Sequence, residues 1–274
     1  MSYAAGREAP ASIGAVAPSS LNGARFDVVV VGGGITGAGV ARHAAQCGLS
    51  TLLLESADFA AGTSSRSTKL IHGGLRYLAM GDIALVREAA LERKSLLAMA
   101  PHLTEPRWML VPARNRLQFW KLRLGIGLYE RLGAVPSAER HRNCRRVELA
   151  DVEPLLDRGR LPFACLYREY LTDDARLVLA ALRAAAADGA VVCNYARVTG
   201  VEQHAGGGRV AVVDARSGDA CSVDAACVVN AAGPWVESLL PTDHAGADRS
   251  APRLHLSKGV HLVVERGRLP VRNM

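Results

Sequence analysis

A glycine-rich segment near the start of the chain carries the clearest chemical signal. Residues 32–37 read GGGITG and satisfy the pattern G-x-G-x-x-G. We expect Gly32 to make a tight turn, Gly34 to let the backbone approach a pyrophosphate, and Gly37 to let a helix pack closely on the preceding strand. The N-terminus of that helix would attract the phosphate charge. The segment therefore predicts a dinucleotide-binding turn.

An acidic residue follows this turn at the spacing that the pattern requires. Glu55 lies 23 positions after Gly32, directly after the three leucines 52–54. We expect its carboxylate to accept hydrogen bonds from the ribose hydroxyls of the nucleotide. Its negative charge also disfavours a 2′-phosphate, so NADP is the least favoured dinucleotide.

A long polar loop follows the acid and helps to choose among dinucleotides. Residues 61–74 are rich in Ser, Thr and Gly, and the loop is longer than an ordinary connection between a strand and a helix. Its hydroxyls and backbone amides, together with the Gly73-Gly74 pair, could run along an extended FAD molecule toward the isoalloxazine. A solvated loop without a ligand is the alternative that composition leaves open.

The elements that must position these residues alternate between strands and helices. Residues 26–31 are almost wholly apolar and β-branched, which predicts a strand covered on both faces of a parallel sheet. A small-residue helix over about 36–47 and a buried strand over 49–54 complete one βαβ unit of an α/β fold. Further along we expect helices over about 83–99 and 172–187, and strands over about 191–193, 197–203, 209–214 and 226–230.

Length and composition limit the class of protein. A chain of 274 residues suits one large domain or two smaller ones, and the formal charge of +7 suits an anionic ligand, a membrane surface or nucleic acid without choosing among them. The six cysteines show no C-x-x-C pair and no metal-ligand spacing, which predicts reduced thiols in the cytoplasm and no metal site. Residues 1–24 lack a signal-peptide pattern and are expected to form a disordered leader.

The polar loop belongs to a longer recognisable segment. Residues 63–78 read TSSRSTKLIHGGLRYL, which closely resembles the flavin-contacting signature of FAD-dependent glycerol-3-phosphate dehydrogenases of the aerobic type. The glycine segment 32–39 fits the same family. So do the segments MAPHL at 99–103, YLTDDARL at 170–177, VNAAGPWV at 229–236 and SKGVHLVV at 257–264.

The resemblance implies a fold and a division into domains. The fold would be a Rossmann-like FAD-binding domain of the glutathione-reductase/D-amino-acid-oxidase type with a partial substrate domain. The FAD-binding domain would be discontinuous, over 25–102 and 150–240, with a basic helical insertion at 103–149. Residues 241–274 would begin a truncated substrate domain, so the chain is expected to be an N-terminal fragment whose activity alone is doubtful.

The resemblance also implies an activity. FAD would take a hydride from C2 of sn-glycerol 3-phosphate to give dihydroxyacetone phosphate, and the electrons would pass to a membrane quinone. The alternatives are another FAD-dependent oxidoreductase of the same fold that acts on an amine or a hydroxy acid, and an inactive nucleotide-binding remnant.

The cofactor residues follow from the turn, from Glu55 and from the resemblance. Ala232-Gly233 resembles a turn that closes the nucleotide pocket, and Val198 lies in a strand whose counterpart touches the adenine. The full set expected at FAD is Gly32, Gly34, Gly37, Glu55, Ser64, Ser65, Ser67, Thr68, Lys69, Leu70, His72, Gly73, Gly74, Val198, Ala232 and Gly233.

Substrate and catalytic residues are implied by the resemblance alone. Arg76 and Tyr77 are expected in the substrate pocket, where the planar Arg76 guanidinium suits the phosphate or the developing carbonyl. Lys258 belongs to a K-G-x-H element that would lie over the flavin, with Lys258 as a substrate ligand. The expected catalytic residues are Arg76, His261 and His72.

The base that deprotonates the C2 hydroxyl is expected to be a histidine, because that residue type titrates near neutral pH. His261, His255 and a residue that follows the end of this chain all stay open as candidates.

A basic segment stands apart from the cofactor motifs. Residues 114–146 contain nine Lys/Arg and two Glu, together with apolar and aromatic residues. The segment suits an anionic membrane surface, and a solvated face packed on the catalytic domain is an equal alternative. Nucleic acid is not expected, because no recognition motif accompanies the charge. The location is therefore expected to be cytoplasmic or peripheral on the inner face of the cell membrane, with a homodimer as a further expectation.

Overall fold

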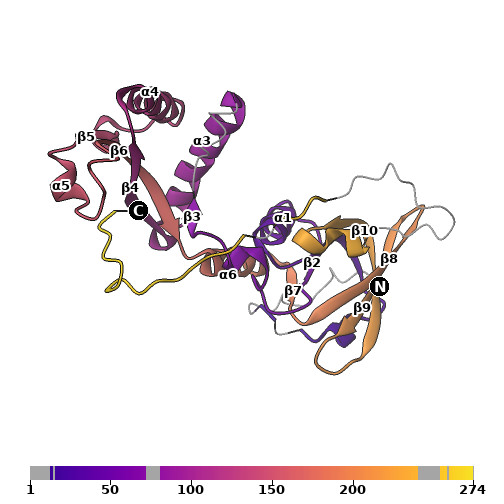
Figure 1. Cartoon of the computed structure of the whole chain (residues 1–274). Helices are drawn as coiled ribbons and strands as arrows, with labels where there is room; N and C mark the ends of the chain where they lie inside the picture. Colours follow the sequence, from indigo (N-terminus) through magenta and orange to yellow (C-terminus); the bar gives the residue numbers. More distant parts are fainter. Residues whose placement is uncertain (1–12, 15, 72–80, 240–253, 258, 274) are drawn as a thin grey trace. The chain divides into compact units, whose positions relative to one another are not determined.

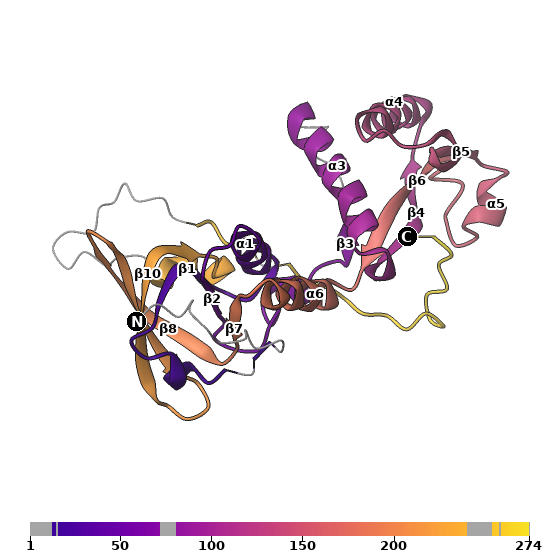
Figure 2. The ribbon, with the colours of Figure 1, turned by 180° about the vertical axis from the view of Figure 1, so that it is seen from behind.

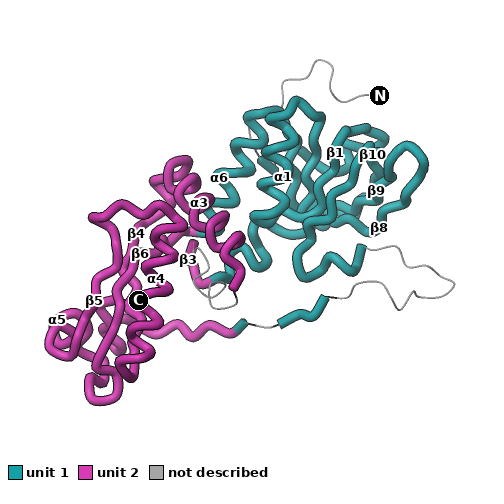
Figure 3. Tube along the Cα trace, turned by 90° about the horizontal axis from the view of Figure 1, so that it is seen from above, with its two compact units in different colours: residues 1–67, 174–259 teal, residues 68–173, 260–274 magenta. Residues whose placement is uncertain are grey.

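The computed structural model describes residues 13–14, 16–71, 81–239, 254–257 and 259–273. The chain divides into two compact units, shown in different colours in Figure 3. The first unit comprises residues 1–67 and 174–259, and the second unit comprises residues 68–173 and 260–274.

The first unit is built on a six-stranded sheet of order β7-β2-β1-β10-β9-β8 (Figure 1). The four strands from β7 to β10 run parallel, and β10, β9 and β8 form an antiparallel meander. Val28 of β1 lies beside Thr51 of β2 on one side and beside Cys227 of β10 on the other. The strands are β1 (Arg25–Val31), β2 (Thr51–Leu54), β7 (Val191–Cys193), β8 (Ala196–His204), β9 (Gly207–Asp214) and β10 (Ala220–Asn230).

Both faces of the parallel strands are buried. Helices α1 (Ile35–Gln46) and α6 (Asp174–Ala187) cover one face, where Val30 and Leu182 belong to the same apolar cluster. On the opposite face Val29 belongs to a cluster with Val212 of the antiparallel meander. Figure 2 shows the sheet and these helices from behind. The sequence therefore predicted the βαβ unit correctly, because a strand covered on both faces needs an uninterrupted apolar run.

The last part of the expected leader is ordered. A 3-10 helix, η1 (Pro18–Leu21), precedes β1, and Leu21 is buried in the apolar core. The N–H of Gly23 donates a hydrogen bond to the carbonyl of Ser222 over 2.8 Å. These contacts correct the expectation of a disordered leader for this part of residues 1–24.

The second unit is an antiparallel sheet with helices on both faces. The sheet has the order β3-β6-β4, and β5 also pairs with β6. Val86 of α3 and Ile126 of α4 pack on one face, and Leu149 of α5 packs on the other. The elements are β3 (Leu70–Ile71), α3 (Ile83–Met99), β4 (Thr104–Ala113), α4 (Arg116–Leu132), β5 (Arg142–Arg145), α5 (Leu149–Val152) and β6 (Phe163–Thr172).

The structure differs from the expected domain boundaries. Strand β6 pairs with β4 along its whole length, from Ala113↔Phe163 to Thr104↔Thr172. Residues 68–102 and 150–173 therefore lie in the second unit, whereas the sequence placed them in the FAD-binding domain. Residues 103–149 are also not wholly helical, because they contain β4 and β5. The expected helical insertion left β4 out, although the two prolines of this segment are compatible with an edge strand.

None of the helices in the described ranges is long and apolar enough to cross a membrane.

Candidate functional site

The glycine turn requires glycine at two positions for steric reasons. Gly32 has φ of 114°, and a Cβ placed there would collide with the carbonyl oxygen of Ala231. A Cβ at Gly37 would collide with the carbonyl oxygen of Gly32. Strand β1, the turn and helix α1 therefore approach one another more closely than any other residue type allows.

The N-terminus of α1 opens beside a serine from the polar loop. Gly34 is the N-cap residue of α1 and has no side chain with which to cap the helix. The Ile35 N–H donates a hydrogen bond to the Ser64 hydroxyl oxygen over 3.0 Å. Ser64 belongs to the 3-10 turn η2 (Thr63–Ser65). The Ser64 hydroxyl oxygen thus lies against a backbone N–H at the N-terminus of α1. Backbone N–H groups in this position hold phosphate oxygens in dinucleotide sites.

Glu55 reaches the same turn from the end of β2. Its Oε2 atom accepts a hydrogen bond from the Gly33 N–H over 2.7 Å, and Oε1 accepts one from the Ala57 N–H over 2.8 Å. These two bonds fix the carboxylate beside the glycine turn. Oε1 also accepts a hydrogen bond from the Ser56 hydroxyl over 3.1 Å, so Oε2 is the oxygen that keeps a further lone pair for a ligand hydroxyl.

A cleft of about 710 Å³ lies within the first unit at this turn. That volume falls inside the range of about 300–1,000 Å³ that is usual for cofactor sites. Seven of the residues expected at the cofactor line the cleft. They are Gly32, Gly34, Glu55, Ser64, Val198, Ala232 and Gly233. Residues separated by about 200 positions in the chain are thus brought to one place, and their role in binding stays a prediction.

Sequence reasoning missed other residues that line the cleft. Thr36 and Trp235 come from α1 and from the 3-10 helix η5 (Gly233–Leu239), and Arg66 and Arg197 add positive charge that suits a pyrophosphate. Arg66 and Trp235 belong to segments that carried the family resemblance, so that signal was present. Arg197 had no signal beyond its place next to Val198.

Several expected cofactor residues have other positions in the structure. Gly37 lies beneath the turn and does not line the cleft. The Ser65 hydroxyl donates to the Gly62 carbonyl over 3.4 Å, and the Ser67 hydroxyl donates to Asp174 over 2.6 Å. Thr68, Lys69 and Leu70 belong to the second unit, where the Lys69 carbonyl accepts a hydrogen bond from the Thr172 N–H.

The expected substrate and catalytic residues fall mostly outside the described residues. This holds for His72, Arg76, Tyr77 and Lys258, and also for the expected cofactor residues Gly73 and Gly74. His255 and His261 are described, and both are exposed. The assembly of a substrate pocket and the identity of the base therefore stay predictions.

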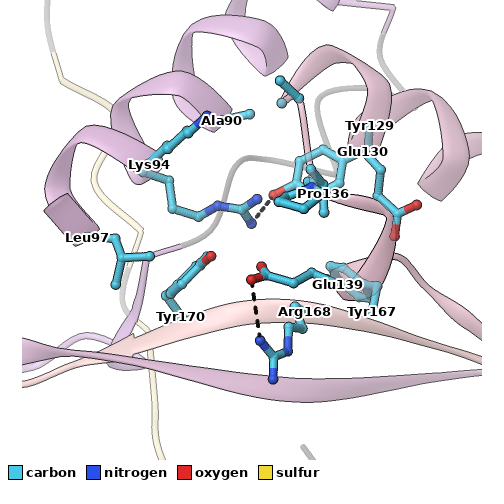
Figure 4. A pocket seen from close by; sticks show the side chains of 14 residues that line it. Ala90, Lys94, Leu97, Tyr129, Glu130, Pro136, Glu139, Tyr167, Arg168 and Tyr170 are labelled. Carbon is cyan, nitrogen blue, oxygen red and sulfur yellow. Dashed lines mark hydrogen bonds and ion pairs between the residues drawn. The ribbon is translucent and has the colours of Figure 1, made fainter. Parts of the chain in front are cut away.

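The second unit contains a buried charged network beside a cavity of about 180 Å³ (Figure 4). Arg93 donates to the Tyr129 hydroxyl over 2.5 Å and to Glu169 over 2.7 Å, and its guanidinium lies 5.0 Å from the centre of the Tyr170 ring. Burial, and next the negative charge of Glu169, raises the pKa of Tyr129 and of Tyr167 far above the ordinary tyrosine value. These tyrosines therefore stay protonated, and we interpret the network as structural.

Comparison with known proteins relates the chain, across both units, to FAD-dependent enzymes. The model described as FAD dependent oxidoreductase matches residues 27–273. Aerobic glycerol-3-phosphate dehydrogenase of Staphylococcus epidermidis is 40% identical over 265 residues, which cover 92% of this chain and 45% of that protein. The enzyme of the same name from Staphylococcus aureus strain USA300 is 40% identical over 258 residues, with the same coverage. The chain thus spans about half the length of the curated relatives that it matches.

Solved structures give a consistent result. Glycerol-3-phosphate dehydrogenase from Bacillus halodurans, crystallised with FAD, has a TM-score of 0.58 and 36% identity over 78% of this chain and 35% of that one. Glycine oxidase from Geobacillus kaustophilus has a TM-score of 0.56 but only 22% identity, over 78% of this chain and 57% of that one, so it supports the fold alone.

Proposed function

Because this chain belongs to the family of FAD-dependent oxidoreductases, we propose that it forms the N-terminal part of an enzyme that oxidises sn-glycerol 3-phosphate to dihydroxyacetone phosphate. The observation that carries the proposal is the 40% identity to aerobic glycerol-3-phosphate dehydrogenases over 92% of the chain. The fold and the FAD cofactor are those of the family. The substrate and the electron acceptor belong to the proposal.

The residues of the cleft fit FAD. The turn at Gly32 leaves no room for a Cβ, and the cleft beside it exposes the α1 N-terminus. We assign the pyrophosphate of FAD to the backbone N–H groups at the N-terminus of α1. Arg66 lines the same cleft and adds a positive charge. Glu55 would accept hydrogen bonds from a ribose, and Val198 would pack against the adenine. When bound, FAD supplies the acceptor for a hydride from C2 of the substrate.

Substrate binding and proton removal are assigned to residues that the family resemblance identifies. Arg76 and Lys258 would bind the substrate phosphate, with Tyr77 beside them, because a guanidinium and an ammonium suit a dianion. A histidine, with His261 as the first candidate, would take the proton of the C2 hydroxyl. The electrons would pass to a membrane quinone, and the enzyme would then lie at the inner face of the cell membrane.

Anaerobic reduction of bound flavin tests the proposal. The purified chain is loaded with FAD, passed through a desalting column and mixed with glycerol 3-phosphate, glycine or sarcosine without oxygen. We expect a retained flavin absorbance that only glycerol 3-phosphate bleaches. Bleaching by glycine or sarcosine instead would assign the chain to the amine oxidoreductases of the same fold. Retained flavin that no substrate reduces would show that this part binds the cofactor but does not oxidise the substrate by itself.

A further inference from the structure

The cavity beside the Arg93 network lies entirely within the second unit (Figure 4). Helix α3, the segment that follows α4 and strand β6 enclose it. Its volume of about 180 Å³ gives room for about six water molecules, at about 30 Å³ each. That is below the range of about 300–1,000 Å³ that is usual for cofactor sites. The cavity therefore suits a small ion or a ligand of a few atoms.

The acids around this cavity already have partners. The carboxylate of Glu169 is paired within the buried network. Glu130 lies 2.8 Å from the ring of His141, and Glu139 lies 3.9 Å from the guanidinium of Arg168. None of these acids needs a further cation from a ligand.

Two buried tyrosines of β6 have hydroxyl groups that are still available. Tyr167 and Tyr170 line the cavity and are 7% and 8% exposed. Neither hydroxyl forms a hydrogen bond with any residue that the structure describes. Figure 4 shows the Tyr170 side chain pointing from the strand into the cavity. Because a buried tyrosine hydroxyl usually finds a partner, these two groups indicate a ligand.

Both hydroxyls are donors at neutral pH. Burial is the main cause that raises the pKa of Tyr170, and burial followed by the charge of Glu169 raises the pKa of Tyr167. Each side chain therefore keeps its proton and can donate it to an acceptor oxygen.

Positive groups complete the set of donors. Lys94 of α3 lines the cavity, and its ammonium has no acidic partner in the described ranges. Arg168 of β6 also lines the cavity, and its buried Nε atom has no acceptor there either. Donors thus come from a helix on one side of the cavity and from a strand on the other.

We propose that this cavity binds a phosphate group, as inorganic phosphate or as a small phosphate monoester. The hydroxyls of Tyr167 and Tyr170 and the ammonium of Lys94 donate to its oxygens. A tetrahedral phosphate has acceptor oxygens on several sides, whereas a carboxylate has two in one plane, so donors from two facing elements favour phosphate. The inference goes beyond the proposed function, because none of these residues lines the nucleotide cleft of the first unit.

Phosphorus NMR of inorganic phosphate tests the proposal. The whole chain is saturated with FAD, so that the nucleotide cleft is occupied, and is then added to the phosphate solution. We expect the phosphate resonance to broaden as protein is added, and acetate to compete poorly. Broadening that occurs only without FAD would belong to the nucleotide cleft and would overturn the proposal. Acetate that competes as well as phosphate would also contradict it.

Two substitutions remove single donors from the cavity. Tyr170→Phe removes one hydroxyl but keeps the ring, whose centre lies 5.0 Å from the Arg93 guanidinium. Lys94→Gln removes the ammonium. Each is expected to weaken phosphate binding about tenfold, because a hydrogen bond to a charged ligand is lost. Circular dichroism checks that the variants are folded.

The chain offers a matched control for each substitution. Tyr195 of the first unit also has a cation over its ring, since the Arg216 guanidinium lies 4.0 Å from the ring centre. Lys121 is exposed on α4 and does not line the cavity. Tyr195→Phe and Lys121→Gln should therefore leave phosphate binding unchanged. Equal losses in the controls and in the cavity variants would overturn the proposal.

Thermal denaturation gives a second measurement of the same site. Phosphate that binds the folded state raises the melting temperature, and phosphate also stabilises proteins generally because it is excluded from their surfaces. The general effect is shared by all variants, whereas the effect of binding should be smaller in Tyr170→Phe and Lys94→Gln. An equal rise of the melting temperature in the wild type and in both variants would contradict a phosphate site in this cavity.

Discussion

The Oε2 atom of Glu55 lies 2.7 Å from the backbone nitrogen of Gly33, whose N–H donates a hydrogen bond to it. The acid expected at the ribose therefore also holds the glycine turn in shape. Binding and preorganisation of the cleft depend on one carboxylate, and substitutions of Glu55 test both.

Glu55→Gln keeps one acceptor oxygen but removes the charge. We expect FAD affinity to fall about 10- to 100-fold, because hydrogen bonds to a charged group contribute about 1.5–3 kcal/mol. Titration of flavin fluorescence measures the change. Glu202→Gln, at an exposed position of β8, is the control that should leave the affinity unchanged. Undiminished affinity in Glu55→Gln would remove Glu55 from the cofactor site.

Gly37→Ala is expected to abolish FAD binding and to destabilise the first unit. The added methyl group would meet the carbonyl oxygen of Gly32, which is rigid backbone. Gly39→Ala, two residues along the same helix, meets nothing within 4 Å and should stabilise the protein by about 0.5–1 kcal/mol. Thermal denaturation with and without FAD compares the two variants, and equal melting temperatures would contradict the close approach of α1 to the turn.

The stability of the first unit is expected to fall at alkaline pH. Burial raises the pKa of the Cys193 thiol from 9.0 to about 12. Below pH 9 both states hold the proton, but above it the unfolded state loses the proton while the folded state keeps it. The free energy of unfolding should therefore fall by about 1.4 kcal/mol per pH unit for this thiol between these values.

Urea denaturation from about pH 8 to about pH 10 measures this slope. In Cys193→Ala the slope should be shallower by the contribution of one thiol. Val191→Ala removes apolar volume from the same buried strand without a titrating group, so it should lower stability equally at every pH. A slope that is the same in both variants would contradict the assignment to Cys193.

Removing one partner of the buried ion pair in the second unit is expected to lower the free energy of unfolding more than replacing both partners with apolar residues. Arg93 and Glu169 are 6% and 1% exposed and lie 2.7 Å apart. Arg93→Met leaves a buried carboxylate without this cation and should destabilise the unit by about 3–5 kcal/mol. The double variant Arg93→Met, Glu169→Leu should recover most of that loss. Denaturant titration of the wild type, the two single variants and the double variant gives the free energies of unfolding for a double-mutant cycle. If the losses of the two single variants add up to that of the double variant, the two side chains are not coupled.

The sequence predicted the cofactor half of the molecule because its signals are local. The strand before Gly32, the helix that contains Gly37 and the acid at Glu55 lie within about thirty residues and obey one known pattern. The register that places Cys227 beside Val28 has no local signal, since any apolar strand could pair there. The meander was nevertheless predictable from its alternation of apolar residues and from its glycine turn.

The second unit was harder to predict because its order comes from contacts between distant residues. Strand β4 contains Pro106 and Pro112, and proline disfavours a strand prediction. Its strand conformation depends on pairing with the distant strand β6. Arg93 gave no sign that it is buried, because its partner Glu169 is 76 residues away. Helix α4 carries apolar residues on two sides, so periodicity could not show which side faces the protein.

The pairing of β1 with β10 has a consequence for synthesis on the ribosome. About 200 residues separate Val28 from Cys227, so at 5–20 residues per second β1 waits roughly 10–40 s for this neighbour. During that interval the nascent chain displays an apolar strand with one open edge, and the pairing of β4 with β6 can be completed first. The nucleotide-binding turn would then be translated before the second unit and would mature after it. A chaperone that binds extended apolar segments is expected to engage residues 25–31 until β10 emerges.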